Sequence, residues 1–364
     1  MKLKSILFLI LSGLFVMAGF TSCDDDEDMP WNNGATVGLP KYRAFLLTEG
    51  NMGHNDSHLF FIDPEQDTVN VHDIYTAQNK LALGDTGNDM ITYNGDIYVV
   101  MNVSKVLRHL NGAGLAVDSF SHFNYLGEPR YIAENKGKLY VSCYGGYVAR
   151  FDAKTLQIEA SVKVDANPEE LIVYNDKVYC VNSGWGYGNT ISVIDVQKFD
   201  KAESIVTLQN PTGIQEANGH IYVFSSGTYD EYWNYVDKPC CAVFDPSTKK
   251  TTKIGEATRM LAIGDNLYFV NSTTQDWTNY TTTFSQYSAK TNKTESWSLK
   301  NLPSEIASAN VYMMARNPYD GSIYIATSDF VHNSPIYHFD SNFQYLNKKI
   351  VVPATNPNSM VFLN

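Results

Sequence analysis

YNGDIYVVMN, the stretch Tyr93–Asn102, encodes a tight turn followed by a β-strand. Asn94 and Gly95 tolerate the positive φ angles of a hairpin turn, and the β-branched and aromatic residues after them suit a pleated strand. Related turn–strand segments return along the chain at Asn135–Ser142, Tyr174–Asn182, Asn218–Phe224, Gly264–Asn271 and Tyr319–Ala326. Because the local pattern is repeated, we predict a repeated fold.

A tyrosine at the same place in each copy gives the length of the repeat. These tyrosines are Tyr98, Tyr140, Tyr179, Tyr222, Tyr268 and Tyr324, and they lie 42, 39, 43, 46 and 56 residues apart. A period of about 40 to 50 residues is typical of four-stranded propeller blades. The spacing therefore predicts an all-β protein, a seven-bladed β-propeller.

The repeat divides the chain into seven units that each have room for the strands of one blade. Their expected bounds are 42–48 with 58–63, about 89–122, 129–164, 168–208, 211–254, 258–299 and 309–352. The last segment, 356–364, resembles the opening strands of other units but has no unit after it. We predict that it completes the first blade, so that pairing of the N- and C-terminal strands closes the ring and hides its sheet edges.

The chain opens like a bacterial export signal. Lys2 and Lys4 precede an apolar run at 6–20, and small residues lead to Cys23. The alternative is a transmembrane anchor, but the run is shorter than the roughly 20 residues that a spanning helix needs. We expect residues 1–22 to be removed as a lipoprotein signal peptide, and Cys23 to carry acyl chains such as palmitate.

Five acidic residues follow Cys23, and a Pro-, Asn- and Gly-rich stretch continues to about Leu39. Such a run repels itself and stays extended, so we expect residues 23–40 to form a flexible tether and residues 41–364 to form the propeller. A cysteine followed at once by acids also resembles the surface-export signal of Bacteroidota lipoproteins, which implies a lipid-anchored protein on the outer face of the outer membrane. A plain solvated linker and a periplasm-facing anchor are the alternatives.

The charge of the chain argues against one class of partner. Lys and Arg number 27 against 39 Asp and Glu, and removal of Lys2 and Lys4 leaves 25 minus 39, a formal charge of −14. Nucleic acid is therefore not expected to bind, since neutralising phosphates requires a basic face. Aromatic residues make up 13% of the chain, which favours β-sheet with large amphipathic contact surfaces.

Catalytic and metal-binding patterns are weak. The remaining cysteines have no zinc-site spacing, and we interpret them as buried free thiols rather than disulfides: Cys143, Cys180, Cys240 and Cys241. His54 and His58 share a loop with Asp56 and Glu49, but the loop is rich in Gly and Asn, so contact or structural roles are favoured over a metal site. No paired nucleophile and base stands out, and we expect no enzyme activity.

Two sets of loops are expected to meet on one face of the ring: the loops that lead into each inner strand, and those between the second and third strands of each blade. The second set is rich in Tyr, Trp, Asn and Gly, as in 182–189, 227–235 and 274–280. The same residue types form antibody binding sites, where rigid aromatics give contact area and small polar groups adapt their hydrogen bonds. The loops therefore predict a binding face, although each tryptophan taken alone could instead pack between blades.

A family resemblance adds to this interpretation. The strand endings Tyr98–Asn102, Tyr179–Asn182 and Tyr268–Asn271 resemble the Tyr-Val-Thr-Asn repeat of YncE-like seven-bladed propellers, over nearly the whole mature chain. Together with the lipoprotein start, the chain resembles the BtuG-type surface lipoproteins of Bacteroidota, which bind cobalamin (vitamin B12) and work with the TonB-dependent transporter BtuB. A propeller fold alone says little about the ligand.

The resemblance implies that the loop face binds a corrinoid and delivers it to a BtuB-like outer-membrane transporter, with no resident cofactor and with cobalamin as the transported ligand. The alternative is a surface glycan-binding or glycan-active propeller of a carbohydrate-uptake system. By loop position, the expected aromatic contacts are Tyr144, Trp185, Tyr229, Tyr232, Trp233 and Trp277. The expected polar contacts are Asn51, Asn88, Asn102, Arg130, Asn182 and Arg259.

Overall fold

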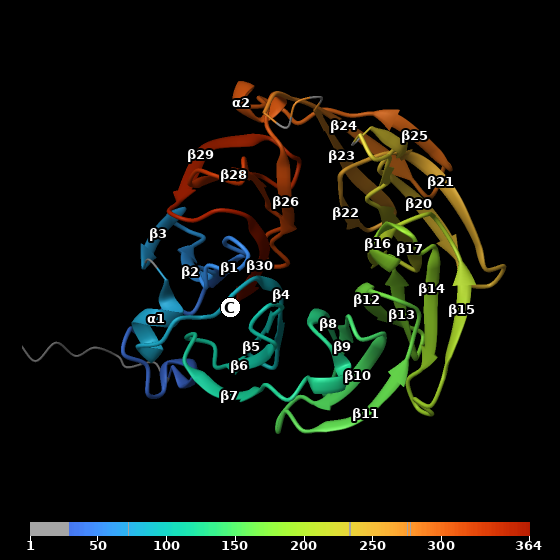
Figure 1. Cartoon of the computed structure of the whole chain (residues 1–364). Helices are drawn as coiled ribbons and strands as arrows, with labels where there is room; N and C mark the ends of the chain where they lie inside the picture. The colour runs from blue at the N-terminus through green and yellow to red at the C-terminus, as the bar shows by residue number, and fades with distance from the viewer. Residues whose placement is uncertain (1–28, 72, 233, 275, 277) are drawn as a thin grey trace, which may run out of the picture.

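Seven four-stranded antiparallel sheets stand around a central axis in the computed structural model (Figure 1). The structure describes residues 29–71, 73–232, 234–274, 276 and 278–364. The arrangement confirms the predicted seven-bladed β-propeller. The signal peptide, the acidic run and Cys23 lie outside the described residues, and so do Trp233 and Trp277.

The strands of the first four blades are given from the axis outward. Blade 1 contains β30 (Pro357–Leu363), β1 (Arg43–Thr48), β2 (His58–Asp63) and β3 (Thr68–Val71). Blade 2 contains β4 (Gly87–Tyr93), β5 (Asp96–Met101), β6 (Val106–Leu110) and β7 (Ala116–Phe120). Blade 3 contains β8 (Pro129–Asn135), β9 (Lys138–Cys143), β10 (Tyr147–Asp152) and β11 (Ile158–Lys163). Blade 4 contains β12 (Pro168–Tyr174), β13 (Lys177–Asn182), β14 (Thr190–Asp195) and β15 (Ala202–Val206).

The remaining three blades follow the same order, with one insertion. Blade 5 contains β16 (Pro211–Ala217), β17 (His220–Ser225), β20 (Cys240–Asp245) and β21 (Lys250–Glu256), and between β17 and β20 the small hairpin β18 (Thr228–Tyr229) and β19 (Tyr235–Asp237). Blade 6 contains β22 (Arg259–Ile263), β23 (Asn266–Thr274), β24 (Tyr280–Ser288) and β25 (Lys293–Ser296). Blade 7 contains β26 (Val311–Arg316), β27 (Ile323–Thr327), β28 (Ser334–Phe339) and β29 (Tyr345–Val352).

The ring is closed by the predicted pairing of the two ends of the chain. β30 lies antiparallel to β1, with Arg43 opposite Leu363 and Leu47 opposite Ser359. Phe362 and Leu363 are buried, Phe362 among side chains of blades 1 and 7 and Leu363 among those of blades 1 and 2. Blade 1 therefore contains strands from both ends of the propeller.

The repeated turn and tyrosine have clear structural reasons. Asn94 and Gly95 have φ angles of 50° and 83°, as the hairpin from β4 to β5 requires. Tyr98 packs among core residues of blades 2 and 3, and its hydroxyl donates to the carbonyl of Ala153 at 2.9 Å. The aromatic ring fills the space between neighbouring blades, and the hydroxyl is hydrogen-bonded. The repeated tyrosine therefore marks one packing position per blade.

Bulges near the start of the inner strands position the side chains that face the axis. The register between inner and second strand shifts between Pro129 and Ile132, and again between Pro168 and Leu171. The Ile132 N–H is satisfied by the carboxyl of Asp89 in the preceding blade, at 2.9 Å. A bulge leaves one residue unpaired and turns its side chain, so the second residue of these strands points to the axis.

The start of the described chain does not behave as the expected flexible tether. Residues 30–32 form the short helix η1 (Pro30–Asn32), and Trp31 lies under the guanidinium of Arg43 at 4.7 Å. The side chain of Gln78, in helix α1 (Ile74–Asn79), binds the backbone of Thr36 and Val37. The segment is held because its apolar and backbone groups find partners on blades 1 and 2, which a composition rich in Pro, Asn and Gly does not reveal.

Three other short helical segments connect strands: η2 (Asn124–Leu126), η3 (Gly184–Gly186) and α2 (Ser304–Ala307). Within the described residues, no helix is long and apolar enough to cross a membrane. The four cysteines of the propeller are buried and free, as interpreted from their spacing.

Candidate functional site

A cavity on the loop face lies over blades 2 to 5 and reaches Met52 in the β1–β2 loop of blade 1, and we call it the cup. Its volume is about 1010 Å³. It is lined by Met52, Asn102, Val103, Glu128, Arg130, Tyr144, Glu169, Ser183, Trp185, Gly186, Tyr187, Asn210, Thr212, Gly227, Thr228, Tyr229, Asp230 and Glu231. These residues come from the lead-in loops and from the loops between second and third strands, the two sets that the sequence predicts to meet.

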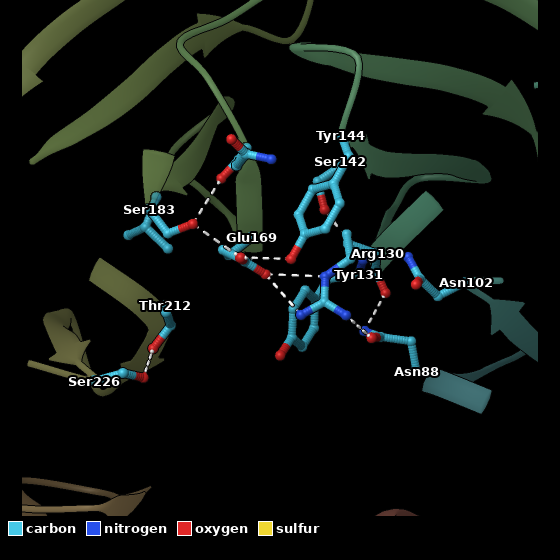
Figure 2. Close-up of polar contacts among 12 residues, drawn as sticks. Asn88, Asn102, Arg130, Tyr131, Ser142, Tyr144, Glu169, Ser183, Thr212 and Ser226 are labelled. Carbon is cyan, nitrogen blue, oxygen red and sulfur yellow. Dashed lines mark hydrogen bonds and ion pairs between the residues drawn. The ribbon is translucent and has the colours of Figure 1, made fainter. Parts of the chain in front are cut away.

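A carboxylate at the floor of the cup organises its polar groups (Figure 2). One oxygen of Glu169 accepts hydrogen bonds from the Tyr144 hydroxyl at 2.8 Å and from the Ser183 hydroxyl at 2.9 Å. The other oxygen accepts from Nε and Nη2 of Arg130 at 3.0 and 2.9 Å. Burial raises the pKa of Tyr144, so this hydroxyl remains a donor. The buried charge of Glu169 is thus fully hydrogen-bonded, as an interior ion pair requires.

Arg130 has its remaining groups occupied by neighbours. Its Nη1 donates to the side-chain oxygen of Asn88, and the Asn88 amide donates back to the Arg130 carbonyl. The guanidinium also lies over the rings of Tyr144 and Tyr131, 4.8 and 5.3 Å from their centroids. The arginine is therefore a structural member of the floor, because its charged hydrogen bonds are already made.

Aromatic side chains form the wall of the cup. Trp185 is 71% exposed and Tyr187 is 92% exposed, and both stand in the loop between β13 and β14. Trp185 has φ 56° and ψ 45°, a left-handed conformation that is strained for a bulky residue. Its ring lies 6.2 Å from that of Tyr144. Tyr229 stands on the blade 5 insertion, where its ring packs 4.6 Å from that of Tyr235.

A second cavity of about 510 Å³ follows the propeller axis, and we call it the central channel. It adjoins the cup, because Arg130, Glu169 and Thr212 line both. More than one residue of each inner strand lines the channel. We call the first lining residue of each inner strand the axial ring: Asn88, Arg130, Glu169, Thr212, Arg259, Tyr312 and Asn358.

Hydrogen bonds link much of the axial ring. The Tyr312 hydroxyl donates to Glu49 at 2.5 Å, and the Asn358 amide donates to the same carboxylate at 3.1 Å. Arg259 donates to the Tyr312 carbonyl at 2.6 Å and lies 5.0 Å from the centroid of its ring. These bonds fix the ring residues before any ligand arrives.

Two further carboxyls face the channel below the axial ring. Desolvation raises the pKa of Asp89 to about 6 and that of Glu170 to about 8, although each accepts a backbone N–H from the next blade. Both side chains are enclosed by the channel wall without a directly bonded cation among the described residues. Glu170 is therefore largely protonated near neutral pH.

The structure brings together some of the sequence-predicted contacts and not others. Asn102, Arg130, Tyr144, Trp185 and Tyr229 line the cup, although Asn102 is buried and donates to the Pro129 carbonyl. Asn88 and Arg259 line the central channel. Asn51, Asn182 and Tyr232 line neither cavity.

The contacts and exposure of these three residues explain why they line neither cavity. Asn182 is completely buried within blade 4, where its amide donates to Thr190 and Ser192. Asn51 binds Asp56 within its own loop, and Tyr232 is exposed near the tip of the blade 5 hairpin. A loop position in sequence therefore does not place an asparagine on the binding surface, because strand ends are also buried.

Sequence reasoning missed Glu169, Tyr187 and Thr212. Glu169 and Thr212 follow Pro168 and Pro211, just as Arg130 follows Pro129, so aligning the repeats on these prolines would have found them. Tyr187 lies in a loop that the sequence does single out, but nothing in the composition separates it from its neighbours. His58, considered for a metal site, instead binds Asp73 at 3.1 Å. Within the described residues, no group of three or more His, Cys, Asp or Glu is arranged to hold a metal ion.

Fold and site together define a seven-bladed propeller with an aromatic-walled cup at one side of its loop face. The chain belongs to the family described as a domain of unknown function (DUF5074), which matches residues 42–231. No curated protein sequence matches the chain.

Solved structures give the same fold at low identity. The chain is similar to apo AztD from Citrobacter koseri, with 11% identity, a TM-score of 0.52, and coverage of 89% of this chain and 98% of that chain. It is also similar to a protein of unknown function from Bacteroides caccae, with 10% identity, a TM-score of 0.51, and coverage of 89% and 100%. At this identity, the likeness establishes the propeller fold.

Proposed function

We propose that the protein is a non-catalytic, surface-anchored binder that takes a corrinoid such as cobalamin into the cup and delivers it to a TonB-dependent outer-membrane transporter. The observation that carries the proposal is the cup itself. Its volume of about 1010 Å³ falls at the upper end of the range for small-molecule sites, so it suits a large ligand. A wall of Tyr144, Trp185, Tyr187 and Tyr229 above a polar floor suits a broad ring with amide groups around its edge.

The cup is organised before the ligand binds. The floor from Asn88 through Arg130 and Glu169 to Tyr144 is held by hydrogen bonds, and the closed ring of blades holds the loops that carry them. Binding to a preformed site loses little side-chain freedom, which permits high affinity from modest contacts. Trp185 is exposed and backbone-strained, as expected for an aromatic that gains its contacts from a ligand.

A glycan ligand is the second candidate. Exposed Trp185 and Tyr187 could pack against sugar rings, and the carboxylates of Asp230 and Glu231 at the cup could accept bonds from sugar hydroxyls. The two candidates separate on one experiment. The purified propeller is mixed with cyanocobalamin and passed over a desalting column, and a red protein fraction is expected. A colourless protein fraction, together with retention of the protein on a polysaccharide, would contradict corrinoid binding and support a glycan ligand.

The proposed location is tested at the N-terminus. Replacing Cys23 with Ala should release the protein from the membrane, since the acyl chains supply the anchor. Replacing the acids at 24–28 with neutral residues should leave the protein anchored but facing the periplasm. Protease shaving of whole cells distinguishes these outcomes, and full accessibility of the acid-free variant would contradict a surface-export role for the acids.

Delivery to a transporter predicts which face meets it. A lipid anchor keeps the protein near the same membrane, where tethering raises the effective concentration of two partners. We expect the loop face to cover the mouth of a BtuB-like transporter. Single cysteines at Asn279, on the loop face, and at Lys136, in a hairpin turn of the opposite face, provide a matched pair for crosslinking. Crosslinks from Lys136 alone would reverse the proposed orientation.

A further inference from the structure

The cup has an unbalanced set of charges. Four carboxylates line it, from Glu128, Glu169, Asp230 and Glu231, against the single guanidinium of Arg130. Beside the cup, Lys105 pairs with Glu128 at 2.6 Å, whereas Asp230 and Glu231 have no ion pair with a basic side chain in the described part of the chain, so the sign of the cup stays negative. An apolar-walled cavity also focuses the field of its charged groups, because the walls have a low dielectric constant.

Arg130, the one basic side chain among the described residues that line the cup, is already paired with a carboxylate of the protein. Arg130 uses Nε and Nη2 on Glu169 and Nη1 on Asn88, and Tyr144 lies against its face. A carboxylate or phosphate is normally recognised by a free arginine fork with two parallel donors. Here the Nε and Nη2 side of the guanidinium is taken by one oxygen of Glu169, and Nη1 already donates to Asn88.

Three of the four carboxylates are more exposed to solvent than Glu169, and we call their part of the cup the rim. Hydrogen bonds from the Asn234 side chain and backbone hold the pKa of Asp230 below its usual value, so it is ionised. A bond from Lys105 at 2.6 Å similarly lowers the pKa of Glu128. Glu231 is exposed and makes no ion pair within the described part of the chain. The rim therefore offers hydrogen-bond acceptors and negative charge.

We infer that the cup selects ligands with an amide or hydroxyl periphery and rejects the same framework when that periphery carries carboxylates. Amide N–H and hydroxyl groups can donate to Glu231 and to the unfilled acceptor positions of the rim. A ligand carboxylate would meet like charges without a free cation to pair with. At separations of about 6 to 8 Å, one added carboxylate should weaken binding by roughly tenfold.

The inference rests on the proposed function, since it takes the cup as the ligand site, and two matched ligands test it. Dicyanocobinamide has an amide periphery, and dicyanocobyrinic acid has carboxylates in place of the amides. Titration of the anchor-free propeller near pH 7, followed by tryptophan fluorescence, should show the acid binding at least about a hundredfold more weakly at low salt. About 0.5 M NaCl should narrow this gap, because it reduces the screening length to a few Å.

Charge variants locate the selection. Replacing Glu128 and Glu231 with Gln should reduce the ratio of the two dissociation constants by about tenfold or more, because two of the negative charges that face the ligand are removed. Glu295→Gln, on the exposed outer strand of blade 6, makes the same chemical change away from the cup and should leave the gap unchanged. The inference would be overturned if the amide and acid ligands bind with equal affinity. It would also be overturned if neither salt nor the Glu128 and Glu231 changes alter the difference in affinity.

Failure of the proposed function gives a different result. If neither corrinoid binds, the corrinoid proposal falls. Charge selection is then measured with a neutral oligosaccharide and a uronic-acid oligosaccharide of similar length, on the same variants. The inference would hold for a glycan ligand if the protein binds the neutral sugar more tightly and the Glu128 and Glu231 changes reduce this preference. Equal binding of the two sugars, or no binding of either, would reject it.

Discussion

Glu169 holds Tyr144 in place: its carboxylate accepts the tyrosine hydroxyl at 2.8 Å, and the two residues come from neighbouring blades. The same carboxylate pairs with Arg130, which stacks on the ring of Tyr144. One wall residue of the cup is thus positioned by an ion pair on its floor.

Replacing Glu169 with Gln should therefore affect both stability and the cup. The side chains of Arg130 and Glu169 are 19% and 6% exposed, so loss of the carboxylate leaves a largely buried cation unpaired. We expect the free energy of unfolding to fall by about 2 to 4 kcal/mol. Ligand affinity should fall in addition at a temperature where the variant is folded. Asp176→Asn, which breaks the exposed Lys136–Asp176 pair, is the control and should change neither chemical denaturation nor binding.

Trp185 should matter for binding and not for folding. Trp185→Ala removes an exposed ring, so the ligand should bind roughly 10- to 100-fold more weakly, a hot-spot loss of about 1.4 to 2.8 kcal/mol. Trp185→Gly should lose the same affinity but be about 1 kcal/mol more stable than the Ala variant, because glycine adopts the left-handed φ without strain. Tyr319→Ala, on a hairpin of the opposite face, is the control. Unchanged affinity in both Trp185 variants would remove this residue from the site.

Glu170 should make stability depend on pH. Its pKa in the folded protein is about 8, above the ordinary 4.5, because burial disfavours the charged form. The folded state then holds more protons than the unfolded state between these values, so this group stabilises the fold at low pH and loses that contribution as pH rises from about 4.5 to 8.

Glu170→Gln isolates that contribution. Gln215 of the next blade stands two residues beyond the position equivalent to Glu170, yet its side-chain oxygen accepts the Ala262 N–H at 3.0 Å, as Glu170 accepts that of Ile214 at 2.8 Å. A glutamine oxygen can therefore take this bonding role. Between pH 5 and pH 7, wild type should lose about 1 to 3 kcal/mol relative to the variant. Denaturation at several pH values measures the difference. A constant difference would mean that Glu170 is ionised throughout.

Removal of residues 357–364 should destabilise the whole ring. The deletion takes away β30, with its pairing to β1 and the buried side chains of Met360, Phe362 and Leu363. We expect one cooperative melting transition that is lower by more than about 10 °C, or no folded protein. Deleting Asn364 alone, which is exposed and outside the strand, should have little effect. Equal melting of the two deletions would contradict closure by β30.

Much of the fold could be predicted because the residues that define each repeat are close together in the sequence. Turn residues such as Asn94 and Gly95 and tyrosines such as Tyr98 recur with the length of one blade, and the unmatched segment at 356–364 indicates the closure. The docking of Trp31 and Gln78 could not be predicted, since it depends on partners that only the folded ring brings together.

The site was predictable as a face but not residue by residue. Loop chemistry indicates the correct side of the ring, yet Asn182 is buried by its own blade while the unpredicted Tyr187 is almost fully exposed. Whether a polar residue contacts a ligand depends on how many of its hydrogen bonds the protein already satisfies. For Arg130 that number is set by Glu169 and Asn88, which lie 39 and 42 residues away in sequence.

The pairing of β30 with β1 also dictates an order of events during synthesis. Blade 1 lacks its innermost strand until residues 357–363 have left the ribosome, so β1 has an open edge while all the other blades are being made. Arg43 and Leu363 pair although they lie near opposite ends of the propeller sequence, and contacts between residues so far apart in sequence form late. The ring therefore stays open until the last strand arrives, and it closes only when β30 pairs with β1.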